Sequence, residues 1–311
     1  MSASTHSFLP WFRLLRLPNL LTVPGDPAAG FLLAAAGAVE PPRPLALAAA
    51  AGASLCLYAF GLVLNDMLDL ETDRRERPDR PLPAGEITVH QARMAAIALA
   101  LSGLNLALVA GRLPLYAAAA LAALIALYNA WLKRIRGAGV AALGLCRGLS
   151  LLLGAAAARP ELFAKEGAQA APVWIAAAGL AFYVAAFSAV ARHETDPEKP
   201  MGPVRWMPFA AALAVLLALV AAVAAQRRLD GLAPTVYVFL MSMTLLRAWL
   251  LGGWLYRLQP VCASVGGHIR NLLMIQGCYC AAAGAAGLLP ALTFVFLSFV
   301  FAKLSKRFYS S

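Results

Sequence analysis

The stretch that decides the fold is Asn65-Asp66-Met67-Leu68-Asp69-Leu70-Glu71-Thr72-Asp73, which follows directly on a long apolar run. Asp66, Asp69 and Asp73 stand at positions i, i+3 and i+7, so they project from one face if the apolar helix continues through them. Three like charges on one face repel each other unless a cation lies between them. Carboxylate oxygens suit Mg²⁺, which commonly takes one or two protein carboxylates together with substrate phosphates. The pattern therefore predicts a metal site at the end of an apolar helix.

The residues that follow are basic and rich in proline: Arg74-Arg75-Glu76-Arg77-Pro78-Asp79-Arg80-Pro81-Leu82-Pro83-Ala84-Gly85. Arginine side chains beside metal-binding carboxylates would complete a site for a diphosphate group. The alternative is a solvated loop, which is the usual meaning of a run of charges. The helical spacing of the aspartates, the preceding Asn65 and the arginine–proline string favour the binding site.

The composition is that of a polytopic membrane protein. The chain has 311 residues, of which 61% are hydrophobic and 13% charged, and its mean hydropathy is +0.73. Apolar runs of about 20 residues, the length that crosses a bilayer as a helix, recur along the whole sequence. We therefore predict an all-α fold in which residues 1–311 form a single membrane domain of nine or ten transmembrane helices.

The expected spans are set by the apolar runs and the polar segments between them. They are residues 19–39, 44–65, 92–110, 114–132, 138–157, 171–191, 205–225, 232–254 and 267–288. A shorter run at 289–304 could be a tenth helix, or the second half of a bent ninth helix that breaks at Pro290.

Basic residues predict the orientation in the membrane. The net charge of +11 could suggest nucleic acid, but the basic residues are spread over short loops, so no nucleic-acid partner is expected. Lysine and arginine are concentrated before the first run and after the second, fourth, sixth and eighth runs. By the positive-inside rule this side is cytoplasmic. We expect an integral protein of a bacterial inner membrane, with the aspartates opening to the cytoplasm and with the oligomeric state left open.

A second acidic cluster lies on the same predicted side. Glu194, Asp196 and Glu198, followed by Lys199, come after the sixth run, whereas Asp66 comes after the second. Two carboxylate clusters that are far apart in sequence and share one face of the membrane suggest one cation-dependent site.

The motifs resemble those of the UbiA superfamily of intramembrane prenyltransferases. The Asn-Asp-x-x-Asp-x-x-x-Asp string at 65–73, continuing through Arg77-Pro78 and Arg80-Pro81-Leu82-Pro83-Ala84-Gly85, looks like the family's first aspartate-rich motif. Arg16-Leu17-Pro18-Asn19, with Thr22 and Gly25, is similar to its first helix. Tyr128 with Lys133-Arg134 resembles the residues that close its fourth helix.

The resemblance implies a helical bundle around a central cavity, in which Mg²⁺ bridges aspartates to an isoprenyl diphosphate. The expected catalytic residues are Asp66, Asp69, Asp73 and Glu194, and the expected metal ligands are these four and Asp196. The residues expected to bind the diphosphate are Asn19, Asn65, Arg77, Arg80, Tyr128, Lys133, Arg134, Arg147 and Lys199. For Lys133 and Arg134 the alternative is an anchoring role at a cytoplasmic helix end.

The second acidic cluster departs from the family pattern. That pattern presents several aspartates with a following glycine and lysine, whereas here Glu194 and Asp196 are two residues apart and Pro197 interrupts. Positions two apart on a helix do not face each other, so a bend near Pro197 would be needed for both to reach one ion. The departure leaves open whether the chain has a second metal site.

Arg147 interrupts the fifth apolar run. A charge inside a membrane span costs about 2.5 to 3.5 kcal/mol on insertion scales, which makes it a functional candidate with a partner. It could pair with Glu194, bind the diphosphate or an acidic group of an acceptor, or form a structural ion pair. The string Cys146-Arg147-Gly148 resembles the EboC-like branch of the superfamily, in which such a string occupies the fifth helix.

The leading prediction is a Mg²⁺-dependent transferase that moves a prenyl group from an isoprenyl diphosphate to a lipophilic acceptor within the membrane. Cleavage of an allylic C–O bond leaves the electrons on diphosphate, so metal ions and cations around it stabilise the developing charge. An apolar cavity would keep water away from the allylic cation. The alternative is a UbiA-like protein that binds or transports an isoprenoid or a pigment precursor without catalysis.

Overall fold

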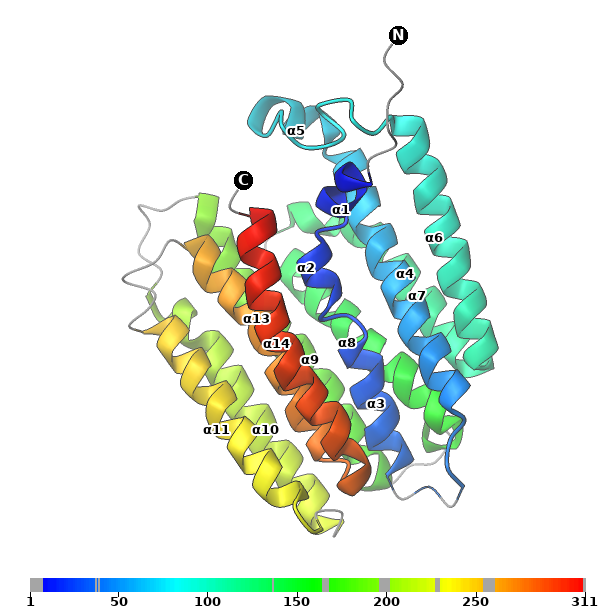
Figure 1. Cartoon of the computed structure of the whole chain (residues 1–311), viewed down its shortest axis with the longest axis vertical. Coiled ribbons are helices and arrows are strands. Elements are labelled where there is room, and N and C mark those ends of the chain that lie inside the picture. Colours follow the sequence, from blue (N-terminus) through cyan, green and yellow to red (C-terminus); the bar gives the residue numbers. More distant parts are fainter. Residues whose placement is uncertain are drawn as a thin grey trace.

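The chain forms an all-helical bundle in a computed structural model (Figure 1). The structure describes residues 8–36, 38, 40–135, 137–163, 168–195, 202–226, 230–253 and 261–309. All regular structure within these ranges is helical, which confirms the predicted class. The α-helices are α1 (Leu9–Leu14), α2 (Leu17–Leu20), α3 (Gly25–Ala35), α4 (Pro44–Leu68), α5 (Leu70–Glu76), α6 (Val89–Ala110), α7 (Arg112–Ala130), α8 (Ala138–Ala158), α9 (Ala171–Ala191), α10 (Met207–Ala225), α11 (Ala233–Gly252), α13 (Val261–Ala281) and α14 (Leu288–Tyr309).

Eight helical segments in the described ranges are long and apolar enough to cross a membrane. They contain α4, α6, α7, α8, α9, α10, α11 and α14. Two further helices lie in the same bundle: α3, which has 11 residues, and α13, which has 21 residues and a buried polar set that includes His268, Asn271 and Gln276. The observed helices match the expected spans to within about five residues, with two exceptions. The α3 helix covers only Gly25–Ala35 of the expected span 19–39, and α13 begins six residues and ends seven residues before the expected span 267–288.

The final apolar run forms a helix of its own. The chain reverses after α13 through a turn in which Gly284 has φ 85°, a conformation that favours glycine. At Gly287 a side chain would collide with the carbonyl oxygen of Cys280, so the turn is tight. Pro290 lies in the first turn of α14, where its missing N–H is tolerated, and does not mark the break. The end of α14 therefore points to the same end of the bundle as α1 and α5, in line with an even number of crossings (Figure 1).

Glycines bring α3 and α9 close to α8. Gly144 and Gly148 of α8 face the carbonyl oxygens of Ala181 and Ala177 in α9. On another side of α8, Gly154 faces the carbonyl oxygen of Pro27, which lies in α3. Small residues allow such close approach between membrane helices. Because these contacts leave no space for a side chain, they fix the position of α8, which carries Arg147.

The segment between α4 and α6 is held against the end of the bundle that carries α1. Leu82 and Ile87 are buried in a cluster with Leu14 of α1 and Val63 of α4. Thr88 caps α6 through a capping box with Gln91. These contacts place the arginine–proline string beside the aspartates at the end of α4.

Candidate active site

The three aspartates lie at the junction of α4 and α5. Asp66 is in the last turn of α4, Asp69 is the residue between the two helices, and Asp73 is in α5. Helical hydrogen bonds continue across the junction, from the Asp69 amide to the Asn65 carbonyl (2.9 Å) and from the Asp73 amide to the Asp69 carbonyl (2.8 Å). Asp66 and Asp73 are buried, whereas the Asp69 side chain is 33% exposed. The predicted helical register is therefore nearly kept, with a small irregularity at Asp69.

Each of these carboxylates has a basic partner. Arg80 places Nη1 2.6 Å from Oδ2 of Asp73 and 3.8 Å from Oδ1 of Asp66. Lys133, from the short helix after α7 (Leu132–Arg134), places Nζ 2.6 Å from Oδ1 of Asp69. Lys133 also donates to Oδ1 of Asn65 at 3.4 Å. The structure thus joins two predicted basic residues to the predicted aspartates from distant parts of the chain.

Arg16 belongs to the same cluster. Its Nη2 lies 3.7 Å from Oδ1 of Asp66. Its backbone is left-handed, with φ 49° and ψ 57°, and no other non-glycine residue in the described ranges has positive φ. Such a conformation is unfavourable and persists only where the surroundings impose it, commonly at functional sites. Sequence reasoning quoted Arg16 as part of the first-helix string but gave it no role.

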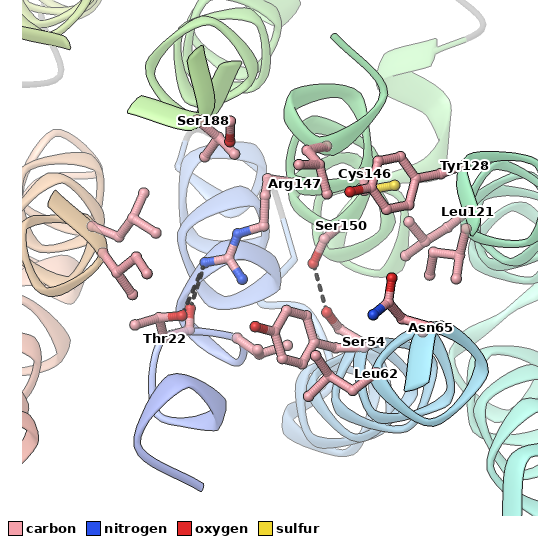
Figure 2. Close-up of a pocket in the computed structure, with 18 of the residues that line it drawn as sticks. Thr22, Ser54, Leu62, Asn65, Leu121, Tyr128, Cys146, Arg147, Ser150 and Ser188 are labelled. Carbon is pink, nitrogen blue, oxygen red and sulfur yellow. Dashed lines mark hydrogen bonds between the residues drawn. The ribbon is translucent and has the colours of Figure 1, made fainter. Parts of the chain in front are cut away.

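A cavity of about 410 Å³ opens inward from this cluster. It lies between α4, α7, α8, α9 and α13, and its lining includes both polar and apolar side chains (Figure 2). Arg16, Asn65 and Tyr128 line its polar end. The apolar part of its wall is formed by Leu62, Leu121, Ile125, Leu143, Val184, Phe187, Ile269 and Leu272. A hydrocarbon group can therefore lie in the bundle while a charged group stays among the basic residues.

A second cavity of about 400 Å³ lies on the outer side of the cluster. Its lining includes four arginines and two prolines of the arginine–proline string: Arg13, Arg16, Arg77, Arg80, Pro78 and Pro81. Arg77 is exposed and lines this outer cavity. Its backbone amide donates to the Asp73 carbonyl (2.8 Å), but in the described ranges its side chain forms no ion pair with the three aspartates. Arg16 lines both cavities and so stands between them.

The other predicted diphosphate residues are distributed unevenly. Tyr128 lines the inner cavity, whereas Arg134 is exposed at the surface and Asn19, in α2, lines neither cavity. Asp196 and Lys199 lie outside the described residues. The backbone of Glu194 falls in a short helix after α9 (Arg192–Thr195), but its side chain lies outside the described part. The predicted second cluster therefore stays a prediction.

The carboxylates present fit a magnesium ion that is shared with a substrate. Among the described residues there is no group of three or more Asp, Glu, His or Cys side chains that could hold a metal without help. Asp66 and Asp73 nevertheless face the same guanidinium nitrogen of Arg80, which shows that a positive charge is accommodated between them. Two carboxylates plus phosphate oxygens form a common Mg²⁺ site. The donor set therefore fits Mg²⁺ together with a diphosphate rather than Mg²⁺ alone.

A buried polar network lies deeper in the bundle. Arg147 is 8% exposed and Asp26 is fully buried, and their Nε and Oδ2 atoms are 2.8 Å apart. Arg147 Nη2 also donates to the Thr22 carbonyl at 2.8 Å, and Gln276 donates to Oδ1 of Asp26 at 2.7 Å. The described partner of Arg147 is thus Asp26, whereas the side chain of Glu194, the partner considered from the sequence, lies outside the described part. Asp26 was missed, although a lone carboxylate in the first apolar run is itself a signal of a buried partner.

Aspartates at a helix end, cations around them and a partly apolar cavity behind them define a helical membrane protein with a charged site at one end of an internal cavity. Residues 27–259 match the UbiA prenyltransferase family. The chain belongs to this family.

Relatives of known identity match the chain over part of its length. The digeranylgeranylglyceryl phosphate synthase of Methanoculleus marisnigri is 32% identical over 53% of this chain and 58% of its own length. The synthase of the same name from Ignicoccus hospitalis is 34% identical over 47% of this chain and 46% of its own length. The chain therefore spans about half the length of these relatives.

Solved structures of UbiA proteins share the fold. A UbiA homologue from Aeropyrum pernix has a TM-score of 0.63 at 21% identity, over 88% of this chain and 98% of its own. A homologue from Archaeoglobus fulgidus, bound to GPP and Mg²⁺, has a TM-score of 0.57 at 17% identity, over 94% of this chain and 99% of its own. At these identities the likeness concerns the fold alone.

Proposed function

We propose that this protein is a Mg²⁺-dependent prenyltransferase that takes a prenyl group from an isoprenyl diphosphate and transfers it to a lipophilic acceptor within the membrane. The observation that carries the proposal is the inner cavity, which joins a basic and acidic cluster at one end to an apolar wall at the other. An isoprenyl diphosphate has the same two-part character. Membership of the UbiA family and the names of the relatives agree with this reaction class.

The basic residues of the cluster would hold the diphosphate. Arg16, Arg80 and Lys133 approach the aspartates from three different segments, so an anion at the junction of α4 and α5 would be surrounded by positive charge. These cations stabilise the negative charge that grows on the diphosphate as the C–O bond breaks. Asn65 would orient the site, because it contacts both Lys133 and Asp66 at 3.4 Å.

Asp66 and Asp73 are the carboxylates that would hold Mg²⁺, with Asp69 as a third ligand once Lys133 contacts the diphosphate. When bound, the ion supplies Lewis-acid stabilisation of the leaving diphosphate. The apolar wall of the inner cavity excludes water from the reacting carbon. Glu194 and Asp196 remain candidates for a second ion, and Tyr128, Arg77, Arg134, Lys199 and Asn19 remain candidates for diphosphate contacts.

The membrane setting is part of the proposal. Among the described residues, α1, α5 with its arginines, and Lys133 with its contact to Asp69 lie at one end of the bundle, and the positive-inside rule makes that end cytoplasmic. We assign the chain to the inner membrane of a bacterium and to the EboC-like branch of the family. The branch assignment is supported by the position of Cys146-Arg147-Gly148 on α8, which is the fifth helix of the bundle in chain order when α3 is counted with the membrane-length segments.

The test is prenyl transfer by the Asp69→Asn variant. Asp69 is a predicted metal ligand, so the variant should lose Mg²⁺-dependent release of diphosphate from geranyl, farnesyl and geranylgeranyl diphosphates, measured with a panel of lipophilic acceptors. Glu71→Gln is the matched control, because Glu71 lies two residues away, is exposed and pairs only with Arg74 in the described part of the chain. Full metal-dependent activity of a folded Asp69→Asn variant would overturn the assignment.

The second candidate is a binding or transport protein for an isoprenoid that lacks catalysis. The altered second cluster favours it, because Glu194 and Asp196 are two residues apart and are followed by Pro197. This candidate predicts tight Mg²⁺-dependent binding of isoprenyl diphosphates with no diphosphate release. The activity assay above separates the two functions directly.

A further inference from the structure

The Arg147 network forms part of the wall of the inner cavity. Arg147 and Thr22 both line the cavity, and Figure 2 shows the guanidinium turned toward Thr22 on one side and toward the open centre on the other. The contacts of Nε and Nη2 are with Asp26 and Thr22. In the described part of the chain, Nη1 makes no hydrogen bond and is not sealed from the cavity. It is therefore a fixed donor that a bound molecule can reach.

The depth of Arg147 places it beyond the diphosphate cluster. Lys133 lies just before α8 and contacts Asp69 at the end of α4, so the start of α8 and the end of α4 are at the same level. Arg147 is nine residues into α8 from Ala138, and Asn65 is three residues from the end of α4 at Leu68. At 1.5 Å per residue the difference in depth is about 9 Å, less than two helical turns. A donor at this level faces the region next to a bound diphosphate and not the diphosphate itself.

The charge of this wall is balanced. Arg16, at the mouth, and Arg147 are the charged side chains that line the cavity within the described ranges. The charge of Arg147 is neutralised by Asp26, which is fully buried and held by Gln276. An acidic group brought to this level would be a buried charge without a net counter-charge, which is strongly unfavourable.

Uncharged hydroxyl groups surround the same space. Ser54 and Ser150 face each other with their oxygens 2.6 Å apart, and Tyr58 and Ser188 also line the cavity. A hydroxyl group on a bound molecule could accept a hydrogen bond from Nη1 of Arg147 and exchange hydrogen bonds with such oxygens. It would bring no net charge into the membrane interior.

We propose that the network of Arg147, Asp26, Thr22 and Gln276 is the acceptor-recognition site, and that it selects an uncharged, hydroxyl-bearing acceptor, an alcohol or a phenol, over a carboxylate or a phosphate. Arg147 binds the acceptor oxygen, whereas Asp26 is a positioning residue that also sets the charge of the site. The inference rests on the proposed prenyl transfer and names the chemical class of its second substrate.

The experiment compares matched probes that differ in charge. The full chain in lipid nanodiscs is tested by equilibrium dialysis with 4-hydroxybenzyl alcohol against 4-hydroxybenzoate, and with 1-O-octylglycerol against its 3-phosphate. The wild-type protein should bind the neutral member of at least one pair about tenfold more tightly than the anionic member. Preference for an anionic member, or no binding of any of the four probes, would overturn the proposal.

Asp26→Asn separates recognition from structural support. It is nearly isosteric but leaves the Arg147 charge uncompensated, so the preference should invert and favour the anionic probe by about tenfold. In Asp26→Asn/Arg147→Gln both charges are absent, and preference for the neutral probe should return with weaker binding. Asp230→Asn, which alters an exposed carboxylate that has no described ion pair, should behave as wild type. An unchanged ratio in folded Asp26→Asn would show that the network is only structural.

Two controls keep the outcomes separate. Size-exclusion chromatography reports whether each variant is folded. If Asp26→Asn does not fold, the proposal is judged from the ratio of neutral to anionic probe binding in the wild-type protein and in the double variant. Mg²⁺-dependent binding of geranylgeranyl diphosphate is measured in the same samples. Its absence in the wild-type protein would overturn the proposed function. Its presence together with the wrong charge preference would overturn the acceptor assignment alone.

Discussion

Arg80 offers the sharpest test of how the carboxylate cluster is held together. Its Nη1 atom lies 2.6 Å from Asp73 and 3.8 Å from Asp66. Both carboxylates are buried, with side chains that are 5% exposed in Asp73 and 7% exposed in Asp66. Replacing Arg80 with Met keeps the length of the side chain and removes its charge. Asp66 then retains Arg16, at 3.7 Å, and Asp73 retains no described basic partner. The two buried carboxylates would repel each other.

The magnitude follows from the burial of the pair. Removing one partner of a fully buried ion pair typically lowers the free energy of unfolding by about 3 to 5 kcal/mol. The Arg80 side chain is 25% exposed, so we discount this figure for solvent and expect a loss of about 2 kcal/mol. For a chain of this size that loss lowers the apparent melting temperature by about 4 °C, measured by thermal unfolding in detergent with a metal chelator present.

Magnesium makes the test specific. A divalent ion between Asp66 and Asp73 replaces the missing positive charge, so saturating Mg²⁺ should raise the melting temperature of Arg80→Met more than that of the wild-type protein. Arg75→Met is the matched control, because Arg75 is exposed on α5 and has no described partner. Its melting temperature should differ from that of the wild-type protein by less than about 1 °C. An equal loss with and without Mg²⁺, or no loss at all, would refute the proposed metal-binding role of these carboxylates.

Two further predictions concern the backbone of the site and its scaffold. Arg16→Gly relieves about 1 kcal/mol of left-handed strain but removes the contact of Arg16 with buried Asp66, so the two effects on the melting temperature oppose each other, whereas the KM for the isoprenyl diphosphate should rise several-fold. An unchanged KM in steady-state kinetics would contradict the role of Arg16. Gly144→Val should prevent the close approach of α8 to the Ala181 carbonyl and cost about 3 kcal/mol or more. A melting temperature equal to that of the wild-type protein would show that α8 is free to shift.

The positions of the helices could be predicted from sequence because each apolar run has the length that the bilayer demands. The run at 289–304 was ambiguous for a physical reason, since a proline such as Pro290 can either kink a helix or begin one. The deciding residues were Gly284 and Gly287, which permit a tight reversal. Their meaning depends on the close approach of Cys280, a contact that the sequence pattern alone does not reveal.

The candidate site was predicted in outline from the aspartate spacing, and the structure adds the pairing. The contact of Lys133 with Asp69 follows from the helical ends that meet there, and the link between Arg80 and Asp73 follows from the folded arginine–proline string. Sequence periodicity could not supply the partner of Arg147. Asp26 lies 121 residues before Arg147 and Gln276 lies 129 residues after it, so only the packing of α3, α8 and α13 brings the three residues together.

The glycine contacts of α8 determine where this helical scaffold can change during evolution or engineering. Gly144, Gly148 and Gly154 have no room for larger side chains, so a larger residue at any of them would displace α8 and with it Arg147. Leu62 of α4, Leu121 of α7 and Leu272 of α13 line the same cavity from the other helices. Replacing one of these leucines with a smaller residue would enlarge the cavity, while the backbone that carries Arg147 stays in place.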